Sequence, residues 1–110
     1  MRRTYIGELE EVVLLIVVLL QKDAYGASIV KEIDHQLNRK ISLSAVHATL
    51  HRLQGKGYVE SFMGGATQER GGRRKRFFKI TKTGGQILEE IQESRSLLWR
   101  QLPPNTLLTQ

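Results

Sequence analysis

A continuous apolar run, VVLLIVVLL at residues 12–20, is the most hydrophobic part of the chain. Five of its nine residues are β-branched, and an unbroken run has no diagnostic period, so a buried strand is an alternative on propensity alone. We interpret the run as a buried helix that begins in the acidic stretch before it. Nine apolar residues are too few to cross a bilayer, which takes about twenty in a helix. A secretory signal is a rival reading, but the acidic ELEE directly before the run argues against it.

Two amphipathic helices are predicted after this run. Asp23 is a suitable N-cap for the first of them, and Ser42 for the second, which Gly55 and Gly57 end. Their apolar positions recur at helical spacing and are Ile29, Val30, Ile33 and Leu37 in the first, then Leu43, Val46, Leu50 and Leu53 in the second. Two short helices joined by a short polar segment fit a helix-turn-helix, although other all-helical domains would show the same pattern.

From Tyr58 the pattern changes to that of a β-hairpin. YVESFM and RRKRFFKI are predicted strands, and the loop GGATQERGG between them contains four glycines. In the second strand Phe78 and Ile80 share one face with Arg76, whereas Phe77 lies on the other face between two lysines. We therefore expect a hairpin with a long basic tip.

A last helix is predicted after the hairpin, with Thr81 or Thr83 as its N-cap and Pro103-Pro104 beyond its end. It carries an apolar stripe that consists of Ile87, Leu88, Ile91, Leu98, Trp99 and Leu102.

The order of helix, helix, helix, hairpin and helix predicts an α+β fold, a winged helix-turn-helix with three helices and a two-stranded β-hairpin wing. We expect this DNA-binding domain at residues 1–81, a C-terminal dimerisation helix at 82–102 and a short flexible tail at 103–110. A helix beyond a complete winged helix has an apolar side to bury, and a second copy of the chain is the natural partner.

The charge of the chain is concentrated in the predicted wing. The whole chain has a formal net charge of +6, and residues 66–82 hold seven Lys and Arg against one acid, which is also +6. Such a local field attracts polyanions, including nucleic acid and anionic surfaces, although short basic runs are often only solvated loops. On a winged helix the charge would lie where DNA phosphates pass.

Other chemistries find little support in the sequence. The chain has no cysteine, which excludes disulfides, thiolate zinc ligands and thiol nucleophiles. His47 and His51 are four residues apart on one helix, but HATLH lacks the glutamate of a zinc-protease helix and no third ligand is evident, so no metal site is predicted. No Ser/His/acid set indicates catalysis, and no cofactor is expected.

The chain resembles the PadR-type bacterial transcriptional regulators. The resemblance rests on LEEVVLLIVVL, AYGASIVKEI, ISLSAVHATLHRLQGKGYVES and ERGGRRKRFFKITKTG, and it runs from Glu8 to about Leu102. It implies a cytoplasmic homodimer that represses transcription from a two-fold-symmetric operator, with the last helix crossing to the partner subunit. The length matches the family's short form. The chain departs from the family where His47-Ala48 replaces a common Tyr-Pro, a change that bears on base preference.

The predicted DNA contacts come from the second and third helices and the wing. A helical wheel places Ser44, Ala48, His51 and Arg52 opposite the apolar side, with His47 on the boundary. The residues nearest the helix start would meet base edges, and His51 and Arg52 would meet phosphates, unless Arg52 is instead paired within its own chain. The full set of predicted contacts is Tyr25, Ser42, Ser44, His47, Ala48, His51, Arg52, Arg70, Arg73, Arg74, Lys75 and Arg76. The resemblance assigns the wing residues Arg73, Arg74 and Lys75 to phosphate or minor-groove contacts.

Two residues keep alternative roles. The Tyr25 hydroxyl could donate to a phosphate, or the ring could pack in the core. Trp99 is the candidate ligand contact, because an aromatic on this helix lines a ligand pore between subunits in some relatives; packing at the dimer interface is the other possibility. A small molecule that releases the protein from DNA is a further expectation of the resemblance.

Three function classes follow: a sequence-specific DNA-binding regulator, most simply a repressor; a nonspecific nucleic-acid or anionic-surface binder that uses the wing alone; and a protein-interaction module whose wing binds an acidic partner.

Overall fold

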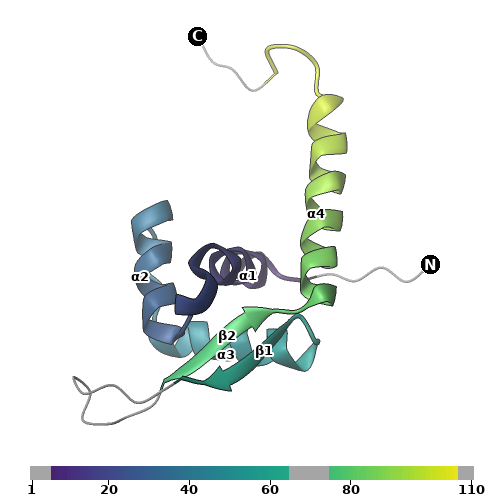
Figure 1. Ribbon diagram of the computed structural model, residues 1–110. Helices are drawn as coiled ribbons and strands as arrows, with labels where there is room; N and C mark the ends of the chain where they lie inside the picture. The colour runs from purple at the N-terminus through teal and green to yellow at the C-terminus, as the bar shows by residue number, and fades with distance from the viewer. Residues whose placement is uncertain (1–5, 65–74, 107–110) are drawn as a thin grey trace.

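A computed structural model of the chain describes residues 6–64 and 75–106 and shows four α-helices and a two-stranded antiparallel sheet in that part of the chain (Figure 1). The elements in chain order are α1 (Glu8–Leu20), the short 3-10 helix η1 (Gln21–Asp23), α2 (Gly26–Leu37), α3 (Leu43–Gly55), β1 (Val59–Met63), β2 (Arg76–Ile80) and α4 (Lys82–Arg100). This is the α+β, winged helix-turn-helix arrangement expected from the sequence.

The apolar run is helical, so the strand alternative is wrong. One side of α1 is the centre of the core, where Val13, Leu14 and Val17 are almost fully buried against α2 and α3. The opposite side is not buried, since Leu15, Val18 and Leu19 are each more than 40% exposed (Leu15 48%, Val18 43%, Leu19 53%). The expectation of a wholly buried helix is therefore corrected to a helix with one covered and one open apolar side.

The caps of α2 and α3 differ in how well the sequence predicts them. Asp23 is not the N-cap of α2, because the chain forms η1 first and the cap falls on Tyr25, whose backbone N–H donates to Ser28 Oγ at 2.9 Å. Ser42 does cap α3, since its Oγ accepts a hydrogen bond from Ala45 N at 3.1 Å. After α3 the chain turns at Gly57, whose φ of +81° suits glycine best.

Two leucines placed on apolar faces by the pattern lie outside the core. Leu37 is 51% exposed at the end of α2, and Leu43 is 47% exposed in the first turn of α3. Thr49 lies fully buried on α3 instead, with its hydroxyl donating to Ala45 O at 2.8 Å. A helix end extends beyond its packing partners, so a periodic position there need not be covered.

The two strands pair antiparallel, with Val59 opposite Ile80 and Met63 opposite Arg76. The predicted alternation holds, because Phe78 is buried in the core while Lys79 and Arg76 are exposed. The backbone just before α2 extends this sheet, since Phe78 N donates to Ala24 O at 2.9 Å. The wing is thus attached to the start of α2 as well as to the end of α3.

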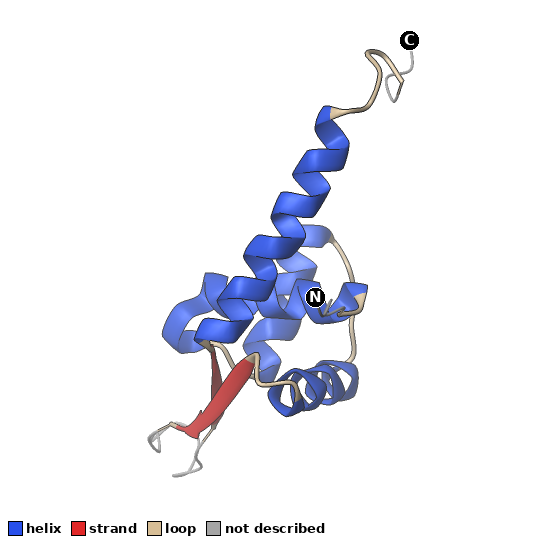
Figure 2. Ribbon diagram, turned by 90° about the vertical axis from the view of Figure 1, so that its right-hand side faces the viewer, coloured by secondary structure: helices blue, strands red, loops and turns tan. Residues whose placement is uncertain are grey.

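The last helix begins against the body and then leaves it (Figures 1 and 2). Thr81 is its N-cap, with Oγ1 accepting from Gly84 N at 3.0 Å and donating to Gly57 O at 2.6 Å. The helix ends at Arg100, two residues earlier than expected from the sequence. No helix in residues 6–64 and 75–106 is both long enough and apolar enough to cross a membrane.

Candidate nucleic-acid interface

The outer surface of α3 presents the residues predicted to meet DNA. Ser44, His47, Ala48 and His51 are all exposed, while the opposite side of the helix, with Val46, Leu50 and Leu53, is buried in the core. Since the exposed residues occupy successive turns, they form one continuous strip, which begins at the capped end of the helix. A helix held in this way can place its N-terminal half in a major groove.

His47 also lies against the start of α2. A Cβ added at Gly26 would lie 2.7 Å from His47 Nε2, so α2 approaches the imidazole at a distance that only glycine permits without a shift. Gly26 therefore allows the close crossing of the two helices of the helix-turn-helix. The imidazole is placed at the joint between them and remains exposed.

Arg52 is paired within its own chain, which was the alternative to a free phosphate contact. Its Nε lies 3.4 Å from Glu10 Oε2, and its Nη2 donates to Thr49 Oγ1 at 3.3 Å. The side chain is nevertheless 55% exposed. Arg52 is thus held in place on the side of α3 next to α1 while part of the guanidinium stays open to solvent.

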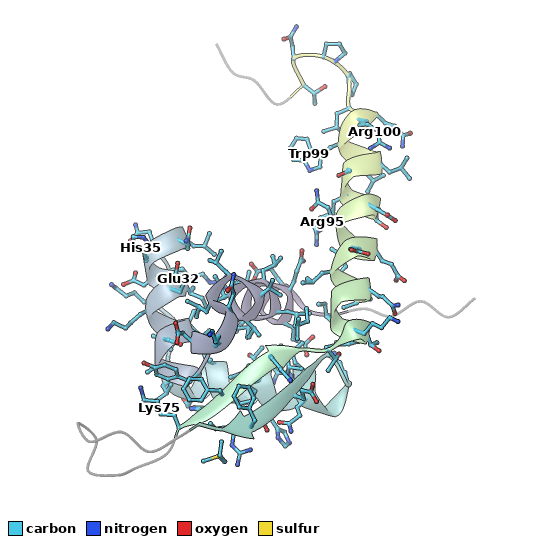
Figure 3. The ribbon with its side chains drawn as sticks, viewed as in Figure 1. Glu32, His35, Lys75, Arg95, Trp99 and Arg100 are labelled. Carbon is cyan, nitrogen blue, oxygen red and sulfur yellow. The ribbon has the colours of Figure 1, made fainter. Side chains whose placement is uncertain are left out.

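Aromatic rings connect the wing to α2. The Tyr25 ring meets Phe77 edge to face, and Phe77 stacks on Phe62 with ring centroids 5.7 Å apart. Lys75 Nζ lies 4.0 Å from the centroid of the Tyr25 ring, a cation–π distance (Figure 3). The ring of Tyr25 therefore packs at the root of the wing, and a cation of the wing lies directly over it.

The remaining wing cations divide into two groups. Arg76 is exposed and donates from Nη1 to Ser61 Oγ at 3.0 Å across the hairpin. Arg70, Arg73 and Arg74, the predicted tip of the wing, lie outside the described residues. The described root already shows two predicted cations, Lys75 and Arg76, next to α3 and the start of α2.

The predicted dimerisation stripe on α4 divides into two parts. Ile87 is 5% exposed and belongs to the chain's own core, and Leu88 and Ile91 pack against that core. Beyond them the helix leaves the body, and Leu98 and Trp99 are 64% and 63% exposed. Trp99 lies on the same side of α4 as Arg95, which reaches Glu11 of α1 at 3.2 Å (Figure 3).

Two features of this surface escaped the sequence reading. Glu10 is 5% exposed and contacts cations of α3, although its place as the third residue of a helix signalled only a role in capping. Gly64 lies so close to the Phe77 ring that any Cβ would collide with it. Neither contact is visible in the sequence, because both partners come from other elements.

A helix-turn-helix with an exposed second helix, a buried opposite side and a cationic hairpin beside it defines the class of winged-helix DNA-binding proteins.

Comparisons with known proteins agree with this class. Residues 14–90 match the family described as "Transcriptional regulator PadR-like family". An uncharacterized protein of Lysinibacillus sphaericus is 31% identical over 87 residues, which cover 77% of this chain and 75% of that protein. A solved PadR-like transcription factor from Bacteroides fragilis has a TM-score of 0.73 at 21% identity, covering 86% of this chain and 85% of its own. A PadR-like transcriptional regulator from Bacillus cereus has a TM-score of 0.68 at 22% identity, covering 84% of both chains.

The chain belongs to the PadR-like family of transcriptional regulators, which are DNA-binding proteins and not enzymes.

Proposed function

We propose that the protein is a sequence-specific repressor that binds a two-fold-symmetric operator as a homodimer in the cytoplasm. The single observation that carries this proposal is the exposed strip on α3, flanked by the cations Lys75 and Arg76 at the root of the wing. The strip would read bases in the major groove, and the wing would hold the phosphate backbone beside it.

The homodimer is supported by apolar surface that one chain leaves open. On α4 this surface consists of Leu97, Leu98, Trp99 and Leu102, and on α1 it consists of Leu15, Val18 and Leu19. Leu97 was not part of the predicted stripe. An apolar helix end projecting from a small domain gains free energy when it is covered, and a second copy offers the matching surface by symmetry.

Release by a small molecule is part of the proposal through Trp99. An exposed indole at a proposed subunit interface offers a flat apolar surface on which an aromatic ligand can stack. Such a ligand would contact both subunits and so could change the distance between the two α3 helices. Packing of Trp99 against the partner subunit, without a ligand, is the competing role.

The test is a fluorescence-anisotropy titration of the protein against its own upstream DNA and an unrelated duplex of equal length, at about 0.15 M salt, where nonspecific binding is weak. A preference of about 10³ or more for the upstream DNA supports a specific regulator. Equal binding to both duplexes would instead favour the nonspecific binder, and no binding to either would favour the protein-interaction module.

A pair of variants separates the proposed roles once an operator is mapped. Arg74→Gln should weaken binding to all sequences alike, because a wing contact to phosphate carries no base information. His47→Ala should change the preference among operator variants at one position in each half-site. The reverse pattern would contradict the assignment of α3 to bases and the wing to phosphates.

A further inference from the structure

The first turn of α1 carries three glutamates, and each pairs with a cation from a different part of the chain. Glu8 pairs with Arg39 before α3 at 2.9 Å, and Glu11 pairs with Arg95 of α4. Glu10 pairs with Lys56 and Arg52 at the end of α3 and is the buried member of the three. Only this buried carboxylate contacts the proposed DNA-reading helix within the described residues.

The carboxylate of Glu10 is fully engaged. It accepts from Gly7 N at 2.6 Å, and Lys56 Nζ lies 3.1 Å from each of its two oxygens. Burial favours a higher pKa, but the hydrogen bonds from Gly7 and Lys56 and the charges of Lys56 and Arg52 outweigh it and hold the pKa of Glu10 below its ordinary value. The group is therefore an anion at neutral pH.

Arg52 is held by two groups along one edge of its guanidinium. Nε faces Glu10 at 3.4 Å, and Nη2 donates to Thr49 Oγ1, which is fixed in turn by its bond to Ala45 O. A guanidinium has five N–H groups in a planar fork, so this arrangement leaves donors directed away from the two supports. The cluster of Arg52, Lys56 and Glu10 has two positive charges and one negative charge, a net +1, and can attract an anion.

We propose that Glu10 is a positioning residue for DNA binding, which holds Arg52 so that its free guanidinium edge meets a backbone phosphate beside α3. This inference rests on the proposed function, because it takes α3 as the DNA-reading helix. The carboxylate does not touch DNA; it acts through Arg52. A long surface side chain that is oriented beforehand loses less conformational freedom when it binds a phosphate than an unrestrained one does.

The alternative, in which Glu10 only stabilises the fold, predicts the opposite sign. A carboxylate near DNA repels phosphates, so its neutralisation by itself should strengthen binding at low salt. If Glu10 positions Arg52, its neutralisation should weaken binding despite the loss of that repulsion. The direction of the change therefore distinguishes the two roles.

The experiment compares the wild type with Glu10→Gln, Arg52→Gln and the double variant in anisotropy titrations across a series of KCl concentrations. Glu11→Gln is the matched control, because Glu11 lies in the same turn but pairs with Arg95 of α4. We expect Arg52→Gln to weaken binding about tenfold and to lower the salt slope by about 0.9, the value for one phosphate contact. We expect Glu10→Gln to weaken binding by a similar factor or somewhat less, and Glu11→Gln to leave it unchanged or slightly stronger.

The double variant gives the decisive comparison. If Glu10 acts through Arg52, the double variant binds no more weakly than Arg52→Gln. Losses that multiply, or a Glu10→Gln protein that binds as tightly as the wild type or more tightly, would overturn the proposal. A titration on an unrelated duplex is included, because a phosphate contact operates there too; equal affinity for both duplexes refutes the sequence-specific repressor but still tests the positioning.

A second variant covers the case in which Glu10→Gln fails to fold. Arg52→Lys changes an exposed side chain and keeps the positive charge, but it removes the Nε–H and the planar fork that the two supports hold. We expect it to lose most of the affinity that Arg52→Gln loses. Wild-type affinity for Arg52→Lys would show that only the charge matters and would contradict the proposal.

Discussion

The ring of Tyr25 meets the ring of Phe77 edge to face, with centroids 5.4 Å apart and planes inclined by 69°. Tyr25 is the N-cap of α2 and Phe77 lies in β2, so this contact joins the helix-turn-helix to the wing. An isolated β-bridge between the same two residues reinforces the joint. The angle at which the wing leaves the body is set here rather than at the hairpin loop.

Substitution at Tyr25 should therefore affect DNA binding through the wing. Tyr25→Leu removes the edge-to-face contact and the surface beneath Lys75, and we expect it to weaken DNA binding about fivefold to tenfold, since aromatic and cation–π contacts of this kind contribute about 1 kcal/mol each. Tyr25→Phe keeps the ring and should retain wild-type affinity. Anisotropy titration measures both, and a loss with Tyr25→Phe would show that the hydroxyl itself contacts a phosphate.

Two neighbouring glycines in α4 should respond in opposite directions to alanine. A Cβ at Gly84 would fall closer than 3.0 Å to Tyr58 O, whereas one at Gly85 would meet nothing within 4 Å. We expect Gly84→Ala to lower the free energy of unfolding by about 2 kcal/mol or more, because a backbone oxygen must move. Gly85→Ala should raise it by about 0.5–1 kcal/mol, through the higher helix propensity of alanine. Urea unfolding followed by circular dichroism gives both values, and equal effects would show that α4 does not approach Tyr58 so closely in solution.

The two halves of the α4 stripe should separate dimerisation from folding. Leu98→Glu alters an exposed side chain, so it should raise the dimer dissociation constant about tenfold or more with little change in the stability of the single chain. Ile91→Glu should lower stability as well as dimerisation, because Ile91 packs against the chain's own core. Glu93→Gln, at an exposed polar position on the same helix, is the control. Sedimentation equilibrium measures association, and a Leu98→Glu protein with undiminished association would contradict the dimer proposed through α4.

The lowered pKa of Glu10 predicts a loss of stability in acid. Burial opposes the shift, but the Gly7 and Lys56 hydrogen bonds and the nearby cations outweigh it, so the folded-state pKa lies below the ordinary value of 4.5. A carboxyl with a depressed pKa contributes stability above its unfolded pKa, and that contribution is lost as the pH falls through the folded pKa. We expect Glu10→Gln to be less stable than the wild type at pH 7 and the difference to shrink as the pH falls below about 4.5. Urea unfolding at a series of pH values measures it, and a difference that stays constant with pH would mean that the charge of Glu10 is not the cause.

The sequence by itself determined the features that depend on neighbours along the chain. Ser42 and Thr81 cap their helices because a hydroxyl reaches an N–H three residues on, and that relation needs no other element. The alternation that buries Phe78 follows in the same way from the period of a strand. The order of these elements, with the basic segment between the two strands, was sufficient to predict the winged helix.

Only the tertiary structure decided which of the patterned faces are covered. The same apolar spacing places Ile87 in the core and leaves Leu98 exposed, because α4 crosses the body with one end only. Arg52 and Glu10 are far apart in the sequence and meet because α3 ends beside the first turn of α1. Periodicity states which side of a helix is apolar, but the packing of helices against one another determines which partner covers that side and which charges become neighbours.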